Sequence, residues 1–258
     1  MGVRRRHIEA AKALPGGPDS MKPGSPWGPL EDLFQHVPLD DRAKNELYAQ
    51  MSAPSRLYHG VGHLELLWRR NVKYRERAGL TDPEIQTLLA CAIAFHDSVY
   101  DPLKIDNEDR SADYWLRASE GSRMCEEDRA WVADTIRVTR DHLAYDPGPP
   151  PADPRALKRE RARLWMLDLD LTPLGEKPPV FAANTRLLRA EARSKSDAKW
   201  IDGLRMFHQH FLSAPCIYRS PALAKLFEAQ ARRNLAIDPA EASSALDKPQ
   251  LIENKTNG

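Results

Sequence analysis

The sequence has little of what marks a secreted, membrane-spanning or nucleic-acid-binding protein. Its three cysteines stand far apart in the 258 residues and form no Cys-x-x-Cys pair, which argues against a disulfide framework and a thiolate zinc site. No apolar run approaches the roughly 18 residues that a membrane span needs. With 38 basic and 37 acidic side chains, the chain lacks the charge excess that attracts nucleic acid. We therefore expect a soluble, cytoplasmic protein with neither a nucleic-acid nor a membrane partner.

Proline and glycine are concentrated near the start of the chain, and the end is polar and aperiodic. Residues 1–26 include Leu14-Pro15-Gly16-Gly17-Pro18, a composition that cannot hold a packed element and predicts a disordered leader. Residues 239–258 are predicted to form a polar tail. Between them, residues 27–238 are expected to form one domain.

Hydrophobic residues recur with the period of an α-helix through almost all of that domain, and no alternating run is long enough for a sheet. Thr81-Asp82-Pro83-Glu84 is a helix start, with a capping residue, a proline and an acid in the first turn. The fold is therefore predicted to be all-α, a single helical domain. The expected helices are 39–51, 61–78, 82–97, 107–119, 126–143, 154–172, 180–194, 197–213 and 220–236.

The pair His96-Asp97 follows the apolar stripe that runs from Ile85 to Ala92. His96 continues the stripe and is expected to face the core. Asp97 meets the negative end of the helix dipole and partial burial, and both disfavour its charge. A metal ion would compensate directly. The alternative for His96 is an ordinary core histidine.

Two further segments carry residues of the same chemistry. His59 and His63 stand one helical turn apart if a helix starts early enough, and the alternative is a helix start with two solvated histidines. Asp168 and Asp170 both flank the apolar stripe of the helix predicted over 154–172, which is costly unless they are paired or bound to a metal. Periodicity alone does not choose between the two aspartates.

The order of these residues, a His, then an adjacent His-Asp, then a distant Asp, resembles the HD superfamily. More narrowly, the chain is similar to the uncharacterised bacterial "predicted metal-dependent HD-superfamily phosphohydrolases", over residues from about 56 to 236. It departs from them at Asp168-Leu169-Asp170, where the family often has Ala between the carboxylates. The matching runs are Tyr58-His59…His63, Phe95-His96-Asp97…Val99-Tyr100-Asp101, Asn107-Glu108…Ser111-Ala112, Thr139…His142, Leu167 to Leu171 with Leu174-Gly175, Ile217-Tyr218, and Ala231-Arg232…Asn234-Leu235.

The resemblance implies an HD-type domain with one divalent metal ion held by His63, His96, Asp97 and Asp170, the second aspartate of its pair. Mixed nitrogen and oxygen ligation suits Mn, Fe, Co, Ni or Zn better than Ca, and Mg also remains in the expected set. A metal-bound hydroxide would then attack a phosphoester or phosphoanhydride of a small molecule, a nucleotide being the expected class. Two alternatives are a di-iron oxygenase, with extra histidine ligands, and a non-catalytic nucleotide-binding domain.

Other residues are expected to serve catalysis or substrate binding. Asp101 and Glu108 are candidates, beside Asp97, for orienting the attacking water or protonating the leaving oxygen, and for both the alternative is helix capping. Basic side chains would help to bind phosphate, although surface arginines usually cover apolar area. For His142 the alternatives are an ordinary core histidine and a ligand of a second metal ion. The predicted substrate-binding residues are His59, His142, Arg189, Arg205 and Arg232.

Overall fold

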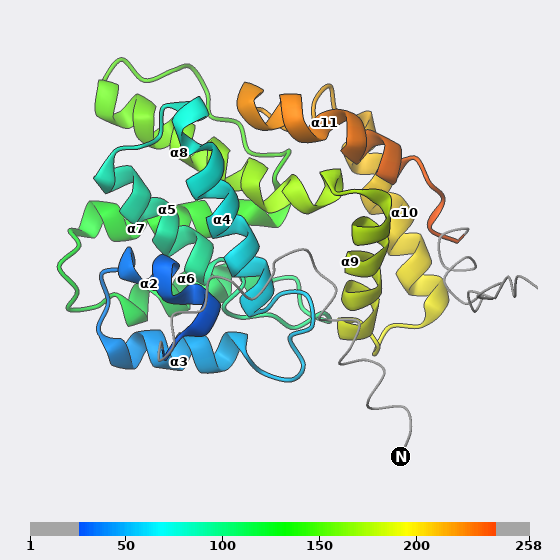
Figure 1. The fold of residues 1–258 in the computed structure, drawn as a ribbon, viewed down its shortest axis with the longest axis horizontal. Helices are drawn as coiled ribbons and strands as arrows, with labels where there is room; N and C mark the ends of the chain where they lie inside the picture. Colours follow the sequence, from blue (N-terminus) through cyan, green and yellow to red (C-terminus); the bar gives the residue numbers. More distant parts are fainter. Residues whose placement is uncertain (1–25, 241–258) are drawn as a thin grey trace, which may run out of the picture. The chain divides into compact units, whose positions relative to one another are not determined.

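The protein is helical throughout the part that the structure describes, residues 26–240. That range contains no β-strand, so the prediction of an all-α fold is confirmed. In this computed structural model the elements follow one another as drawn in Figure 1. They are η3 (Gly28–Leu30), α2 (Glu31–Gln35), α3 (Asp41–Met51), α4 (Val61–Ala78), α5 (Pro83–Phe95), α6 (Asn107–Ala118), α7 (Glu126–Val138), η4 (Thr139–Asp141), α8 (Pro154–Leu171), η5 (Thr172–Gly175), α9 (Pro178–Glu191), α10 (Asp197–Ser213) and α11 (Pro221–Leu235).

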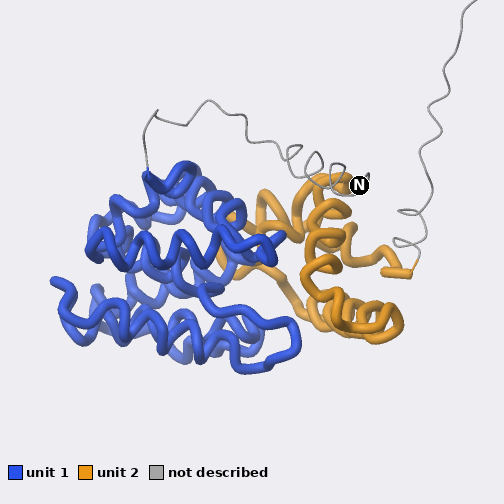
Figure 2. Tube along the Cα trace, turned by 90° about the horizontal axis from the view of Figure 1, so that it is seen from below, with its two compact units in different colours: residues 1–170 blue, residues 171–258 orange. Residues whose placement is uncertain are grey.

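The helices belong to two compact units, which Figure 2 colours separately. Unit 1 ends at Asp170 and unit 2 begins at Leu171, so the boundary lies in the last turn of α8. The sequence carries no signal of this division within residues 27–238, where one domain is expected. The predicted leader (1–26) and tail (239–258) lie outside the described residues, except for residues 26, 239 and 240.

Helix α5 is buried on almost every side within unit 1. From Ile85 to Phe95 only Thr87 is not buried. A helix that is apolar all round belongs in a core, and α5 packs against α2, α4, α6 and α7. Its helix start is as predicted, because Asp82 accepts a hydrogen bond from the backbone N–H of Glu84 (3.0 Å). At the other end His96 is the C-cap, so the packing of this buried helix fixes the position of the His96 backbone.

A chain of buried hydrogen bonds joins α4, α5 and α8. Trp165 Nε1 of α8 donates to Asn71 Oδ1 of α4 (3.0 Å), and Asn71 Nδ2 donates to Gln86 Oε1 of α5 (2.8 Å). Buried polar groups cost free energy unless they are paired, so these bonds favour one relative placement of the three helices.

Two local predictions differ from the structure. No helix was expected before residue 39, yet η3 and α2 occupy 28–35 and bury Leu30, Leu33 and Phe34. These elements are too short for the helical period to appear. The helix predicted over 126–143 ends at Val138 and continues as the 3-10 turn η4. There the Thr139 hydroxyl donates to the carbonyl of Ile136 (2.7 Å), a local bond that competes with regular helix.

Within unit 2, η5 and α11 approach so closely that Gly175→Ala is expected to be destabilising. A Cβ at Gly175 would lie 2.6 Å from Phe227 Cβ and 2.8 Å from the Phe227 carbonyl oxygen, so α11 would have to move. We expect the free energy of unfolding to fall by about 1–3 kcal/mol in urea denaturation. Gly203→Ala is the control, because a Cβ there meets nothing within 4 Å and alanine favours α10. Equal stability of the two variants would contradict the prediction.

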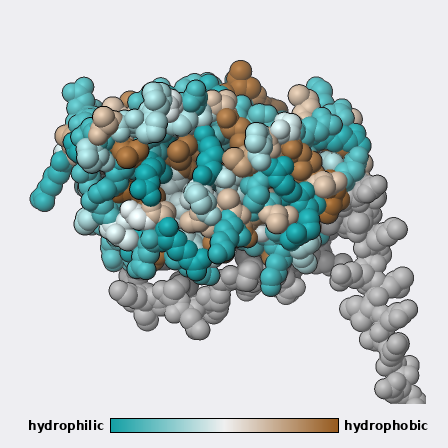
Figure 3. Space-filling model, turned by 90° about the horizontal axis from the view of Figure 1, so that it is seen from above, coloured by the Kyte–Doolittle hydropathy of each residue, from teal (hydrophilic) through white to brown (hydrophobic). Residues whose placement is uncertain are grey.

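Hydrophilic residues dominate the face drawn in Figure 3, and hydrophobic residues stand among them in small groups. The large apolar side chains with the highest exposure are Ile105 (90%) and Met206 (71%) among the described residues. None of the described helices combines the length and the apolar character needed to cross a bilayer.

Candidate metal centre

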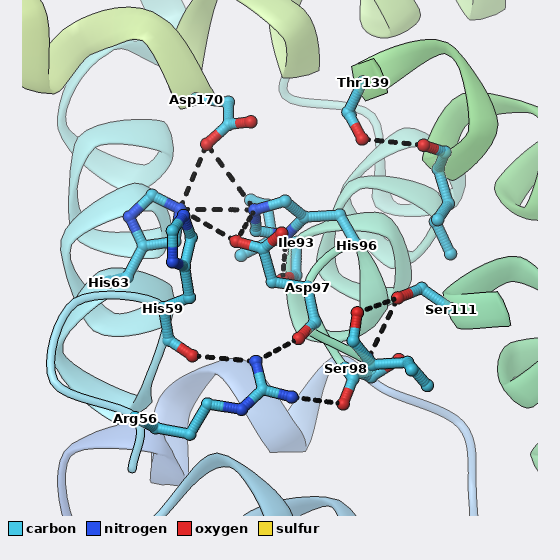
Figure 4. A network of polar contacts seen from close by, with 12 residues as sticks. Arg56, His59, His63, Ile93, His96, Asp97, Ser98, Ser111, Thr139 and Asp170 are labelled. Carbon is cyan, nitrogen blue, oxygen red and sulfur yellow. Dashed lines mark hydrogen bonds and ion pairs between the residues drawn. The ribbon is translucent and has the colours of Figure 1, made fainter. Parts of the chain in front are cut away.

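Three side chains from three helices of unit 1 meet at one point (Figure 4). His63 belongs to α4, His96 caps α5, and Asp170 lies in the last turn of α8. His63 Nε2 is 3.2 Å from His96 Nε2 and 3.0 Å from Asp170 Oδ1, and His96 Nε2 is 3.5 Å from the same oxygen. Both imidazoles are buried.

The spacing of these donor atoms suits a single cation. Ligand bonds of about 2.0–2.2 Å put neighbouring donor atoms roughly 2.8–3.6 Å apart in octahedral or tetrahedral coordination. The separations among His63, His96 and Asp170, 3.0 to 3.5 Å, fall in that range. The three residues therefore form a group that can hold a metal ion.

Asp97, the fourth predicted ligand, lies beside both imidazoles. Its Oδ2 is 3.1 Å from His96 Nε2 and 3.7 Å from His63 Nε2. It stands in a turn after the helix, not in the last helical turn as expected, because α5 already ends at Phe95. Its roles as a ligand and in catalysis stay predictions.

A hydrogen bond behind His96 fixes how its ring faces the group. His96 Nδ1 lies 3.0 Å from the carbonyl oxygen of Ile93, and since a carbonyl only accepts, Nδ1 carries the proton. In the neutral ring Nε2 then directs a lone pair toward Asp97 and Asp170, which is unfavourable unless a proton or a cation lies between them. A backbone carbonyl behind a ligating imidazole is common in metal sites.

The charges of the group shift the pKa of each member. Burial works to lower the pKa of His96, but the carboxylates of Asp97 and Asp170 outweigh it and raise that pKa well above its usual value. Burial works to raise the pKa values of both carboxyl groups, yet the neighbouring histidines, His96 foremost, lower them below their usual range. In the metal-free protein, a proton on His96 thus balances the carboxylates.

Metal binding is therefore expected to release a proton from His96 and to strengthen as the pH rises. Because the pKa of His96 is raised, the metal-free ring keeps its proton near neutral pH, and this proton competes with the metal. Below that pKa, each unit of pH should change the affinity about tenfold. Calorimetric titration in buffers of different ionisation enthalpy counts the released protons. A binding enthalpy that is the same in every buffer would contradict this prediction.

Helix α4 begins just before His63, at a point where a side chain would crowd the backbone of the preceding loop. Gly60 is the N-cap, and a Cβ there would lie 3.0 Å from the carbonyl oxygens of both Met51 and Arg56. His59 therefore precedes the helix, and its ring lies against Tyr100 with 4.1 Å between the centroids. Its predicted part in substrate binding stays a prediction.

His142 joins the group through the outer oxygen of Asp170. Its Nε2 lies 2.8 Å from Asp170 Oδ2, while Oδ1 of the same carboxylate faces His63. Hydrogen bonds to the outer oxygen of a ligating carboxylate fix its orientation. The role in substrate binding that the sequence predicts for His142 stays a prediction beside this observed contact.

The choice between the two aspartates of α8 is decided by geometry. Asp170 contributes a donor atom to the group of three, and Asp168, although buried, does not. Asp170 is thus the aspartate whose carboxylate meets the two histidines, and its role as a metal ligand stays a prediction.

Asp101 and Glu108 have local partners. Asp101 Oδ1 accepts from the backbone N–H of Leu103 (2.9 Å), and Asn107 bonds the backbone N–H and carbonyl of Asp101. Glu108, in the first turn of α6, pairs with Arg140 at 3.4 Å. Their catalytic roles stay predictions.

The three arginines predicted to bind substrate lie in unit 2, and each forms an ion pair within it. Arg189, Arg205 and Arg232 pair with Asp197 (2.6 Å), Asp238 (3.2 Å) and Glu228 (2.7 Å), respectively. Their contribution to substrate binding stays a prediction.

Arg56 is a neighbour of the group that the sequence analysis did not assign. It donates to the carbonyl oxygens of His59 (3.0 Å), Asp97 (2.6 Å) and Ser98 (2.7 Å). The only signal in the sequence was its position three residues before His59, which says nothing about Asp97.

Comparison with known proteins adds no relative. No protein-family model, no curated protein and no solved structure matches this chain. What can be inferred about its function comes from its own residues and their geometry.

Proposed function

We propose that this chain is a metal-dependent phosphohydrolase of the HD type. Its substrate would be a phosphoester or phosphoanhydride of a small molecule, with a nucleotide as the preferred class. The observation that carries the proposal is the convergence of His63, His96 and Asp170 from three helices, with donor atoms 3.0–3.5 Å apart. The order of these residues along the chain, with Asp97 directly after His96, supports the HD assignment.

In this proposal the chain binds and orients the reacting groups, and a bound metal would supply the Lewis acid. A divalent cation, when bound, lowers the pKa of a coordinated water and polarises a phosphoryl oxygen. His63 and His96 would hold it through Nε2 and Asp170 through Oδ1, with Asp97 as the fourth ligand. His142 would keep the Asp170 carboxylate oriented through its outer oxygen. This donor set favours Mn, Fe, Co, Ni or Zn over Ca.

We expect the substrate to be a small molecule and the protein to act in the cytoplasm. Formal net charge is +1, which supports local recognition of a phosphate over attraction of nucleic acid. All three cysteines are free, in keeping with a reducing compartment.

The test begins with elemental analysis of the purified protein. A phosphate-release screen over a nucleotide panel then follows, with Mn, Co and Mg supplied in turn. We expect chelation to abolish any release and added metal to restore it, and His63→Ala to lose both metal and release. A chain that binds none of Mn, Fe, Co, Ni, Zn and Mg, or that releases phosphate equally well after chelation, would overturn the proposal.

A di-iron oxygenase is the second candidate, and one observation favours it. His142 contacts Asp170 on the side away from His63, where a second ion would need a nitrogen ligand. Aerobically purified protein would then contain two irons per chain and give the Mössbauer signature of a coupled pair. One metal per chain would exclude it.

A further inference from the structure

Arg56 connects two segments that are distant in the sequence and that both lead to the candidate metal ligands. Its Nη1 donates to the carbonyl oxygen of His59 (3.0 Å), in the loop that leads to His63. The same nitrogen donates to the carbonyl of Asp97 (2.6 Å), and Nη2 donates to that of Ser98 (2.7 Å). Figure 4 shows this guanidinium below the imidazoles, between the two backbone segments.

The carbonyls of Asp97 and Ser98 lie in a turn beyond the end of α5, outside the hydrogen bonds of a helix. Adjacent carbonyls suit the planar fork of an arginine, whose two Nη atoms bond them at once. Hydrogen bonds from a charged donor are roughly twice as strong as neutral ones. The Ser98 carbonyl also accepts from Gln50 of α3, which anchors the turn to a third element. This turn is therefore held from outside α5.

The backbone held in this way sets the positions of the ligand side chains. His63 stands three residues after Gly60, the tight N-cap of α4, and Gly60 itself lies against the Arg56 backbone. His96 and Asp97 stand at the start of the turn that Arg56 bonds. Motion of either segment would change the 3.2 Å separation of the imidazoles or the 3.7 Å separation of Asp97 from His63.

We propose that Arg56 is a positioning residue of the metal centre, which holds the His63 segment and the His96–Asp97 turn at ligand spacing before the metal binds. The inference rests on the metal site of the proposed function, and it concerns Arg56 and metal affinity alone. Without the guanidinium, the two segments would become ordered only when the metal binds. The cost of ordering them would offset part of the free energy of metal binding, so the metal affinity would fall. Arg56 is not one of the three donor residues and acts through the backbone that carries them.

The experiment measures metal affinity in chelator-stripped protein, with cobalt(II) and zinc(II) as probes. The variants are Arg56→Met, which removes the guanidinium, and Arg56→Lys, which keeps the charge but has a single nitrogen. Arg161→Met is the matched control, because Arg161 also donates to a backbone carbonyl, that of Ala78 (2.7 Å), at the other end of α4. Each protein is examined by competition titration, by the visible spectrum of bound cobalt, and by its metal-free melting temperature.

We expect Arg56→Met to weaken metal binding about ten- to hundredfold, the usual effect of losing an outer-shell partner. Arg56→Lys should lose a smaller part of the metal affinity, since an ammonium keeps the charge but lacks the planar fork that bonds the carbonyls of Asp97 and Ser98. Both should alter the cobalt spectrum, while Arg161→Met should change only the melting temperature.

Unchanged affinity and an unchanged cobalt spectrum in Arg56→Met would overturn the inference and leave the proposed function standing. If Arg56→Met does not fold, Arg56→Lys decides by the same two readouts. Failure of the parent protein to bind metal would instead overturn the proposed function, and with it the centre that Arg56 is proposed to position.

Discussion

Asp170→Asn is expected to lose the bound divalent metal and, with it, phosphate release. Asp170 supplies the carboxylate oxygen that lies 3.0 Å from His63 and 3.5 Å from His96, and its other oxygen bonds His142. An amide oxygen carries no charge to offset a dication, so metal affinity should fall by at least about a hundredfold. The several kcal/mol that a metal supplies to catalysis corresponds to roughly a thousandfold in rate. Elemental analysis and phosphate release measure the two effects.

Asp168→Asn is the control for this prediction. It makes the same chemical change two residues earlier in α8, at a buried aspartate outside the group of three donors. We expect it to change the melting temperature and to leave metal content intact. A variant at Asp168 that loses metal while the variant at Asp170 keeps it would reverse the ligand assignment.

Chelation is expected to lower the thermal stability of the protein strongly. A ligand that binds only the folded state at a thousand times its dissociation constant stabilises that state by about 4 kcal/mol. For a chain of this size, that corresponds to roughly 8–16 °C in melting temperature. Circular dichroism melts with and without EDTA measure the difference. Asp170→Asn should show almost no EDTA effect, and an equal shift in both proteins would mean that the stabilising metal binds elsewhere.

The size of the chelation effect should depend on pH. In the metal-free protein the pKa of His96 is raised by Asp97 and Asp170, so its proton stabilises the fold below the ordinary histidine pKa. That contribution is lost as the pH rises through the raised pKa, where the carboxylates lose their counter-charge. The metal, by contrast, binds more tightly as the pH rises. The difference between EDTA-treated and metal-loaded protein should therefore grow toward alkaline pH.

Much of the fold could be predicted from local patterns in the sequence. The start of α5 was evident because Asp82 and Pro83 act on the backbone of the same turn. The helical period located α4 and α10 with the bounds that the structure has, 61–78 and 197–213. The short segment 28–35 was missed, because fewer than three turns show no period, and its burial of Leu33 and Phe34 depends on the helices around it.

The sequence by itself indicated the residue types of the candidate centre, because His96 continues the apolar stripe that starts at Ile85 and both aspartates flank that of α8, whereas His63 was singled out by the resemblance to the HD superfamily. It could not choose between Asp168 and Asp170. Two residues of α-helix differ by about 200° in direction, and only the neighbouring helices decide which direction meets the histidines.

The tertiary structure alone decided which residues support the ligands. The bond from His142 to Asp170 spans 28 residues, and those from Arg56 to Asp97 and Ser98 span 41 and 42. Helical periodicity describes the faces of one helix and carries no information about which loop carbonyl or carboxylate another segment will reach. Such contacts arise only when α4, α5 and α8 pack together, because packing sets the distances between segments that the chain leaves far apart.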